Sequence, residues 1–227
     1  MLDVRVISIG ALDAHPEWGE GNPVRTAHAT TTLVRSGDRI ILVDPALPPQ
    51  ILAARLGERA GLEAGAVTDV FLTCFRPDVR RGLEAFDGAN WLVSEAERES
   101  VGVSMVQAYQ RAEEAADTEL ADQLKRDIGL LHRCTAAPDR LADHIDLFPL
   151  PGVTPGLCGL LIAERRRTVL VTGDAVATLE HLEAGRVVRW AADVERARES
   201  FAEAVEIADV LVPGRDNVLI NPTRGAF

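Results

Sequence analysis

Short apolar runs separated by turn-forming residues predict strands in both halves of the chain. In the first half the predicted strands cover residues 4–9, 30–35, 39–43, 67–73 and 91–93. In the second half they cover residues 145–150, 157–163, 168–171 and 210–212. Ser36, Gly37 and Asp38 separate one pair of runs, and residues 164–167 separate another. Each of these pairs is therefore predicted to form a β-hairpin.

Apolar residues spaced three or four apart predict helices over residues 48–62, 94–133 and 194–208. The longest of these regions begins with Ser94 followed by Glu97, the pattern of a helix-capping box. Near its end, one helical face carries Leu120, Leu124, Ile128 and Leu131. We interpret this stripe as part of the core, or as the face of a helix laid over the sheets.

The order of these elements predicts the fold class. Strands cluster in both halves, each half ends in a helix, and residues 40–44 and 168–174 are similar hairpin strands followed by an acidic residue. This arrangement predicts an α/β (α+β) protein built as a four-layer αββα sandwich. The length of 227 residues suits one domain over residues 1–227, with a helical insertion at about 94–133.

Composition narrows the functional classes. The formal net charge of -11 disfavours nucleic acid and anionic membranes as partners, because both require a basic surface. No apolar run approaches the roughly 20 residues of a membrane span, and no signal peptide is recognisable. Three scattered cysteines do not form a disulfide framework or a Cys-x-x-Cys zinc site. We therefore expect a soluble, acidic, cytoplasmic protein; a homo-oligomer is compatible with the sequence.

Five short segments carry a resemblance to a known family. They are Leu42-Val43-Asp44-Pro45, residues 72–79 (LTCFRPDV) with Gly82 following, residues 151–156 (PGVTPG), Thr172-Gly173-Asp174 and Pro213-Gly214-Arg215. In order, spacing and predicted local structure they resemble the signature segments of the metallo-β-lactamase superfamily, which includes glyoxalase II-like hydrolases. The resemblance implies the αββα fold, and it implies metal-dependent hydrolysis at one edge of the sandwich.

Most of the positions that bind metal in that family carry different residues here. The resemblance places Cys74, Arg76, Asp78, Val79, Val153, Asp174 and Arg215 at them. Only Asp78 and Asp174 match the family pattern, Cys74 could ligate, and the two valines have no donor atom. We therefore expect a divergent member that lacks most metal ligands and has no metal cofactor, unless Cys74, Asp78 and Asp174 suffice to bind zinc or another divalent metal.

Electrostatics can explain why arginines occupy two of the metal positions. Without metals, Asp78 and Asp174 would remain as partly buried anions with no partner, which is costly. Arg76 and Arg215 at neighbouring positions could neutralise them with geometry suited to carboxylates. We expect an ion-pair cluster in place of a metal centre.

Two residues are candidates for chemistry. Cys74, near Arg76, could be a reactive thiol, although a small buried thiol filling the space of a histidine is the commoner situation. His181 follows the Gly-Asp turn and could reach the cleft as a base or ligand, whereas a lone histidine in a loop is more often a surface residue. The predicted binding cleft comprises Cys74, Arg76, Asp78, Asp174, His181 and Arg215.

The sequence leaves several functions open. The first is a non-hydrolytic protein, a pseudoenzyme or a binder of a small anionic molecule. The second is a divergent metal-dependent hydrolase, or a Cys74-dependent enzyme with His181 as base, acting on an ester, thioester or lactone. A third is a structural role in which residues 94–133 pack against a partner.

Overall fold

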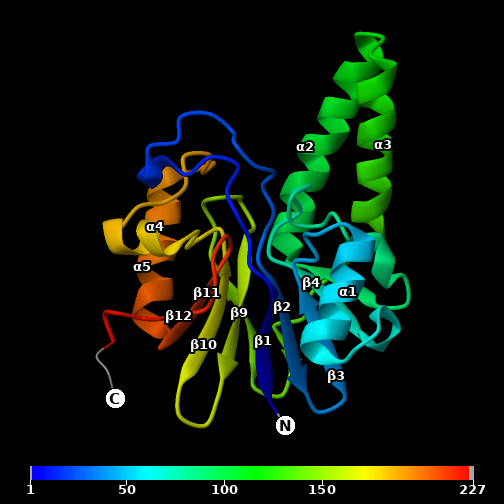
Figure 1. The fold of residues 1–227 in the computed structure, drawn as a ribbon. Coiled ribbons are helices and arrows are strands. Elements are labelled where there is room, and N and C mark those ends of the chain that lie inside the picture. The colour runs from blue at the N-terminus through cyan, green and yellow to red at the C-terminus, as the bar shows by residue number, and fades with distance from the viewer. Residues whose placement is uncertain (1, 225–227) are drawn as a thin grey trace.

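Two six-stranded sheets form the centre of the structure, a computed structural model that describes residues 2–224 (Figure 1). The first sheet has the strand order β1-β2-β3-β4-β5-β6. Its strands are β1 (Asp3–Ser8), β2 (Thr31–Ser36), β3 (Arg39–Val43), β4 (Asp69–Leu72), β5 (Asn90–Val93) and β6 (Thr135–Ala136). The predicted hairpin pairs β2 with β3 in antiparallel register, and β3 to β6 then run parallel to one another.

The second sheet has the order β12-β11-β10-β9-β8-β7. It contains β7 (Arg140–Ala142), β8 (Ile145–Pro149), β9 (Cys158–Ala163), β10 (Thr168–Gly173), β11 (Val210–Pro213) and β12 (Leu219–Ile220). The predicted hairpin pairs β9 with β10, and β10 runs parallel to β11. The short strands β6, β7 and β12 have too few residues for a periodic pattern, so the sequence did not indicate them.

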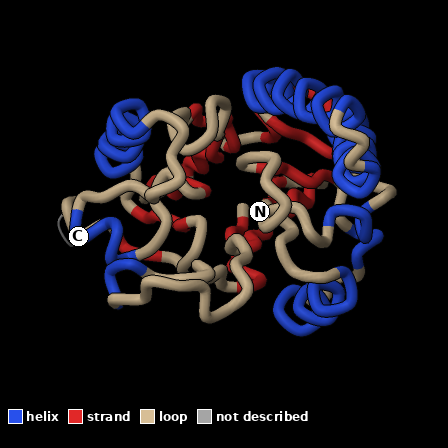
Figure 2. Tube along the Cα trace, turned by 90° about the horizontal axis from the view of Figure 1, so that it is seen from above, coloured by secondary structure: helices blue, strands red, loops and turns tan. Residues whose placement is uncertain are grey.

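Helices cover the outer faces of both sheets (Figures 1 and 2). They are α1 (Pro49–Ala60), α2 (Glu95–Glu114), α3 (Thr118–Arg133), α4 (Leu179–Ala184) and α5 (Val194–Ile207). Single 3-10 turns occupy Pro16–Trp18, Ala64–Ala66 and Leu83–Phe86. α1 buries Leu52 and Leu56 on the face predicted from their spacing, and it ends at Gly61, which has a φ of 63°.

Apolar side chains from both sheets fill the space between them. Ile41, Val43 and Phe71 of the first sheet pack in one cluster with Leu160 and Ile162 of the second. Helix residues pack on the outer faces in a second cluster. The predicted α/β sandwich is therefore confirmed.

The predicted helical insertion is a hairpin of two helices that projects from the sandwich (Figure 1). The chain turns at Ala116, where φ is 55°, and the Asp117 carboxylate caps α3 by accepting the Leu120 amide. The expectation that the apolar stripe on α3 belongs to the core is corrected, because most of this stripe is not buried. Leu120 is 46% exposed, and only Leu131 at the base is buried.

An ion pair anchors the base of this hairpin, where Arg80 lies 2.7 Å from Asp127. None of the helices within residues 2–224 combines the length and the apolar character that crossing a bilayer requires. The assignment of residues 1–227 to one domain stays a prediction.

Candidate functional site

Four loops meet at one edge of the sandwich, and each of them contains one of the segments that suggested the family. The loops follow β4, β8, β10 and β11. β10 and β11 are parallel, so both end at this edge. Backbone hydrogen bonds tie the loops together: Cys158 N donates to Thr73 O at 3.0 Å, and Gly214 N donates to Val176 O at 3.0 Å.

Two glycines allow this close approach. Gly173 has a φ of 52°, and a Cβ there would lie 2.8 Å from Thr73 Oγ1. A Cβ on Gly214 would lie 2.5 Å from Asp174 Oδ1. The Gly-Asp and Pro-Gly-Arg segments therefore need glycine, since a side chain would push the loops apart.

Arg215 is the centre of a buried ion-pair cluster. Its Nε and Nη2 each donate to one oxygen of Asp174 at 2.7 Å, a bidentate contact. Its Nη1 lies 2.7 Å from Asp78 Oδ2, which is close enough for an ion pair but without hydrogen-bond geometry. The Arg215 side chain is 1% exposed. Burial acts to lower the pKa of Arg215, but Asp174 and Asp78 outweigh it and raise that pKa above its usual range.

Arg76 completes the cluster at its open side. Its Nε donates to Asp78 Oδ1 at 3.2 Å, and its guanidinium lies 5.4 Å from the centre of the Trp190 ring. Burial acts to raise the pKa of Asp78, but Arg215 and Arg76 hold it below its usual value. Each of the four carboxylate oxygens of Asp78 and Asp174 thus contacts a guanidinium nitrogen.

Asp44 is a further buried carboxyl group at this edge. Its oxygens accept the Thr73 amide at 2.8 Å and the Thr73 hydroxyl at 2.7 Å. Burial raises the pKa of Asp44 to about 7, against the lowering effect of these two hydrogen bonds. The sequence marked Asp44 as the acidic residue after a strand and as part of the first family segment, but did not place it in the predicted cleft.

The other family positions are filled by buried side chains. Cys74 is 1% exposed, Val79 is 1% exposed and Val153 is 2% exposed. Burial and the nearby Glu97 raise the pKa of the Cys74 thiol well above its usual value, so the thiol stays protonated. This environment disfavours Cys74 as a nucleophile and suits a small side chain that fills space.

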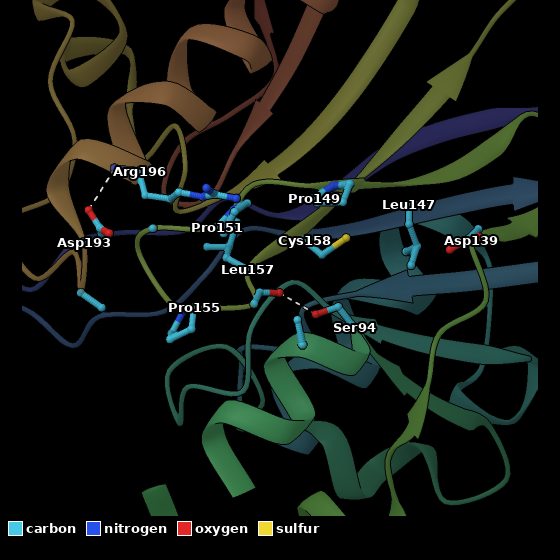
Figure 3. Close-up of a pocket in the computed structure, with 14 residues that line it drawn as sticks. Ser94, Asp139, Leu147, Pro149, Pro151, Pro155, Leu157, Cys158, Asp193 and Arg196 are labelled. Atoms are coloured by element: carbon cyan, nitrogen blue, oxygen red, sulfur yellow. Dashed lines mark hydrogen bonds between the residues drawn. The ribbon is translucent and has the colours of Figure 1, made fainter. Parts of the chain in front are cut away.

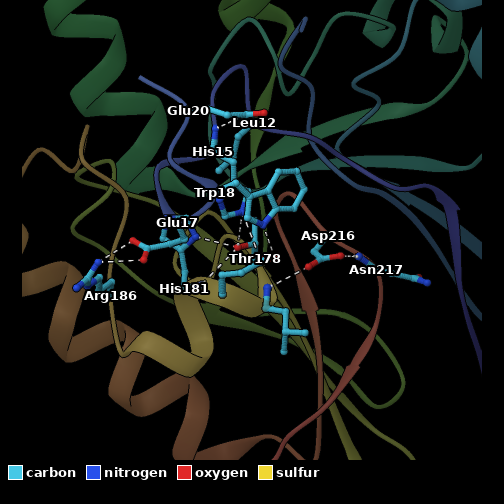
Figure 4. Close-up of polar contacts among 12 residues, drawn as sticks. Leu12, His15, Glu17, Trp18, Glu20, Thr178, His181, Arg186, Asp216 and Asn217 are labelled. Atoms are coloured by element: carbon cyan, nitrogen blue, oxygen red, sulfur yellow. Dashed lines mark hydrogen bonds and ion pairs between the residues drawn. The ribbon is translucent and has the colours of Figure 1, made fainter. Parts of the chain in front are cut away.

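His181 lies in a buried polar cluster beneath the N-terminal loop (Figure 4). Its Nδ1 lies 2.9 Å from Thr178 Oγ1, and His15 Nε2 approaches the same hydroxyl at 3.2 Å. His15 Nε2 is also 3.2 Å from Glu180 Oε2, and its ring stacks on Trp18. Burial lowers the pKa of His181, and the electrostatic effect of the neighbouring His15 ring lowers it further. A neutral, buried His181 differs from the exposed loop histidine that is usual.

The N-terminal loop therefore covers part of the cleft, and two small cavities remain on either side of Arg215. One has a volume of about 230 Å³ and is bordered by His15, Trp18 and Thr178. The other, of about 140 Å³, is bordered by Arg76, Asp78 and Trp190. Sequence reasoning did not find the contact of His15 with Thr178, because the two residues are 163 positions apart.

The structure brings together most of the predicted cleft. Asp78, Asp174, Arg76 and Arg215 form one connected cluster. Cys74 lies in the apolar core beneath them, and His181 lies in the neighbouring polar cluster.

This fold and these loops define the class of the protein. The sequence profile of the metallo-beta-lactamase superfamily matches residues 25–215, and the chain belongs to that superfamily. A search of curated protein sequences finds no match.

Solved structures with the same fold include three of particular interest. A putative metallo-beta-lactamase from Thermotoga maritima is 18% identical, with a TM-score of 0.68 over 96% of this chain and 99% of its own. AidC, a dizinc quorum-quenching lactonase, is 18% identical, with a TM-score of 0.61 over 78% of this chain and 67% of its own. An N-acyl homoserine lactone hydrolase with product bound at its catalytic metal centre is 20% identical, with a TM-score of 0.65 over 95% of this chain and 92% of its own.

These structures correct the expectation that no metal cofactor is involved. One is a dizinc enzyme and another binds its product at a catalytic metal centre, so a metal, normally zinc, is usual in this fold family. The replacement of residues at the family's metal positions was too narrow a basis for excluding a metal cofactor. Zinc therefore has to be supplied in any test of this protein.

The arrangement of donors in this chain does not fit a dinuclear centre. The oxygens of Asp78 and Asp174 are engaged by guanidinium groups, and Val79 and Val153 offer no donor atom. Within residues 2–224, no group of three or more His, Cys, Asp or Glu side chains converges as metal ligands do. As they are arranged here, these side chains do not supply the ligand set that a dinuclear metal centre requires.

Proposed function

We propose that this protein is a non-hydrolytic member of the metallo-β-lactamase superfamily that binds a small anionic molecule in the cleft beside Arg215. The observation that carries the proposal is the contact of all four oxygens of Asp78 and Asp174 with guanidinium nitrogens. Arg215 and Arg76 hold the pKa of Asp78 below its usual value, which makes this carboxylate a poor general base.

Arg76 is the residue that would bind the anion. Arg215 is buried and divides its charge between two carboxylates, so it has little to offer a ligand. The side chain of Arg76 is 37% exposed and borders the cavity of about 140 Å³ beside Trp190. Of its three guanidinium nitrogens, Nε contacts Asp78, which leaves the terminal nitrogens for a carboxylate or phosphate.

A metal-dependent hydrolase acting on an ester, thioester or lactone is the second candidate. It is favoured by the retained pair of carboxylates, Asp78 and Asp174, which lie at the same edge and share Arg215. A ligand or metal that displaced Arg215 would free them.

Two measurements test the proposal. We expect no turnover of an N-acyl homoserine lactone, a thioester or a phosphate ester, with Zn²⁺ or Mn²⁺ supplied or omitted. Turnover that depends on added metal and is lost in Asp174→Asn would contradict the proposal and establish the second candidate.

Binding is measured by calorimetry with acetate, malonate and inorganic phosphate as probes. We expect at least one of them to bind, and Arg76→Gln to weaken that binding about tenfold or more, since a charged hydrogen bond is lost. Arg55→Gln is the matched control, because Arg55 is a partly exposed arginine on α1 paired with Glu58. Equal affinity in the two variants would overturn the role of Arg76.

A further inference from the structure

A second and larger groove shares no lining residue with the two cavities beside Arg215, although the loop after β8 borders it (Figure 3). It has a volume of about 760 Å³, within the range of small-molecule sites. On one side it is bordered by Ser94 and Ala96 at the start of α2. On the other side lie Leu147 and Pro149 of β8 and the start of α5.

The wall of this groove is closely packed. The loop of residues 151–156 forms part of it and is held between the first turns of α2 and α5. A Cβ on Gly152 would lie 2.2 Å from Ala197 N, and one on Gly156 would lie 1.9 Å from Glu97 N. The Ser94 hydroxyl donates to Gly156 O at 2.5 Å. Such close packing favours a groove that keeps its shape when a ligand binds, which lowers the entropic cost of binding.

The floor of the groove is apolar. Leu147, Leu157, Cys158 and three prolines are its main apolar side chains. Burial raises the pKa of the Cys158 thiol to about 12, so the thiol stays neutral and acts as a small apolar group. A contiguous apolar floor of this kind favours a hydrocarbon chain.

Charge is distributed unevenly along the groove. Arg196 lies at one end and Asp139 at the other, and the Arg196 side chain extends away from Asp193 and toward Pro151 (Figure 3). The Asp193 carboxylate accepts the Arg196 amide at 3.0 Å and so caps α5. Within residues 2–224, the Arg196 guanidinium has no hydrogen bond and no carboxylate within ion-pair distance.

We infer that this groove binds an amphipathic molecule with one anionic head group and an apolar tail, such as an acyl carboxylate. Arg196 binds the head group, and the tail lies over Leu147 and Cys158. Asp139 at the far end repels a second negative charge, so the groove discriminates against dicarboxylates. This site shares no residue with the arginine cluster and does not rest on the function proposed for it.

The test uses octanoate as the probe, with the full chain and calorimetry. We expect saturable 1:1 binding of octanoate, and binding weakened about tenfold or more for octan-1-ol, which has no charge, and for octanedioate, which has two. Arg196→Gln should weaken octanoate binding to a similar extent. Arg198→Gln is the matched control, since it removes an exposed arginine two positions along the same helix. It should leave the affinity unchanged.

Location is tested with an octanoate that carries a diazirine at the end of its tail. We expect the cross-link to fall on the peptides that contain residues 147–158. No binding of octanoate, equal binding by Arg196→Gln, or cross-links confined to other peptides would each overturn the inference. Loss of octanoate binding in Arg76→Gln with Arg196→Gln unaffected would also overturn it, because the fatty acid would then occupy the arginine cluster.

Discussion

Single residues at the edge of the sandwich compensate one another. Two carboxylates at family metal positions are buried or half-buried beside two arginines, and a bidentate contact joins Arg215 to Asp174. A charge without a partner in such a place costs several kcal/mol, whereas a paired one is tolerated. The arginines and the aspartates are therefore best understood as one unit.

The first prediction concerns the energetic coupling between Arg215 and Asp174. Arg215→Ala should lower the free energy of unfolding by about 3–5 kcal/mol, because it leaves Asp174 charged and buried. Part of this loss should return when Asp174→Asn is combined with it. Denaturant unfolding of both single variants and the double variant gives the coupling energy. Arg198→Ala, at an exposed position, is the control and should change stability by less than about 0.5 kcal/mol. Additive losses would show that Arg215 and Asp174 are independent.

The second prediction concerns Asp44 and pH. The pKa of Asp44 is raised from 3.8 to about 7 by burial, so an unfolded chain releases this proton at lower pH than the folded one. The contribution of Asp44 to stability is therefore complete below about pH 4 and is lost as the pH rises toward 7.

Asp44→Asn keeps an acceptor for the Thr73 amide and removes the titration. The difference in unfolding free energy between wild type and Asp44→Asn should shift in favour of the variant between pH 4 and pH 7. Denaturant unfolding at several pH values measures it. Parallel curves would mean that Asp44 titrates alike in the folded and unfolded chain.

At the scale of elements, one buried carboxylate joins α2 to two loops of the site. Glu97 accepts the Phe75 amide at 2.9 Å, the Thr154 hydroxyl at 2.6 Å and the Gly156 amide at 3.2 Å. The predicted capping box is only half formed, since Ser94 accepts the Glu97 amide while the Glu97 side chain turns to the loops. Burial raises the pKa of Glu97 despite these hydrogen bonds. The start of α2 thus positions the segments that contain Cys74 and Val153.

The third prediction tests this connection. Glu97→Gln should lower the free energy of unfolding by about 1–3 kcal/mol, because its amide group cannot accept from both backbone amides and leaves one without a partner. Hydrogen exchange at Phe75 or Gly156 should accelerate. Glu95→Gln removes an exposed carboxylate from the same helical turn and should cost less than about 1 kcal/mol. If both variants lowered the free energy of unfolding equally, the loss would come from the helix terminus alone.

At the scale of the whole molecule, the α2–α3 hairpin is the least integrated part of the sandwich. Its outer turns project beyond the sheets, and its contacts with the body lie near its base (Figure 1). There, Arg80 binds Asp127, and Leu131 is buried as part of the core cluster. Within residues 2–224, no ion pair joins these outer turns to the sheets, and we therefore expect the sandwich core to survive their removal.

The fourth prediction follows from that geometry. Replacing residues 109–122 by a glycine linker of roughly three residues should leave a cooperatively folding protein, with a midpoint of thermal unfolding within about 5 °C of wild type. Circular dichroism on heating checks it. Asp127→Ala is the contrast, because it leaves the buried Arg80 without its partner and should be the more destabilising change. Loss of cooperative unfolding in the shortened chain would show that the outer turns belong to the core.

The amino-acid sequence by itself determined the local elements and the fold. Both hairpins, the helix ending at Gly61, the cap at Ser94 and the five family segments depend on neighbours within a few positions, where turn chemistry and periodicity act directly. The αββα sandwich follows from these elements, because their apolar faces can be buried together in few ways.

Only the tertiary structure decided which groups meet. Arg215 and Asp174 are 41 positions apart, and His15 and Thr178 are 163 apart, so no local pattern specifies their distances or their burial. The stripe on α3 had the periodicity of a core face, and packing against α2 left most of it outside the sandwich. The reason is physical: periodicity fixes which face of an element is apolar, whereas the partner of that face, and the pKa of a group beside it, depend on how distant segments pack.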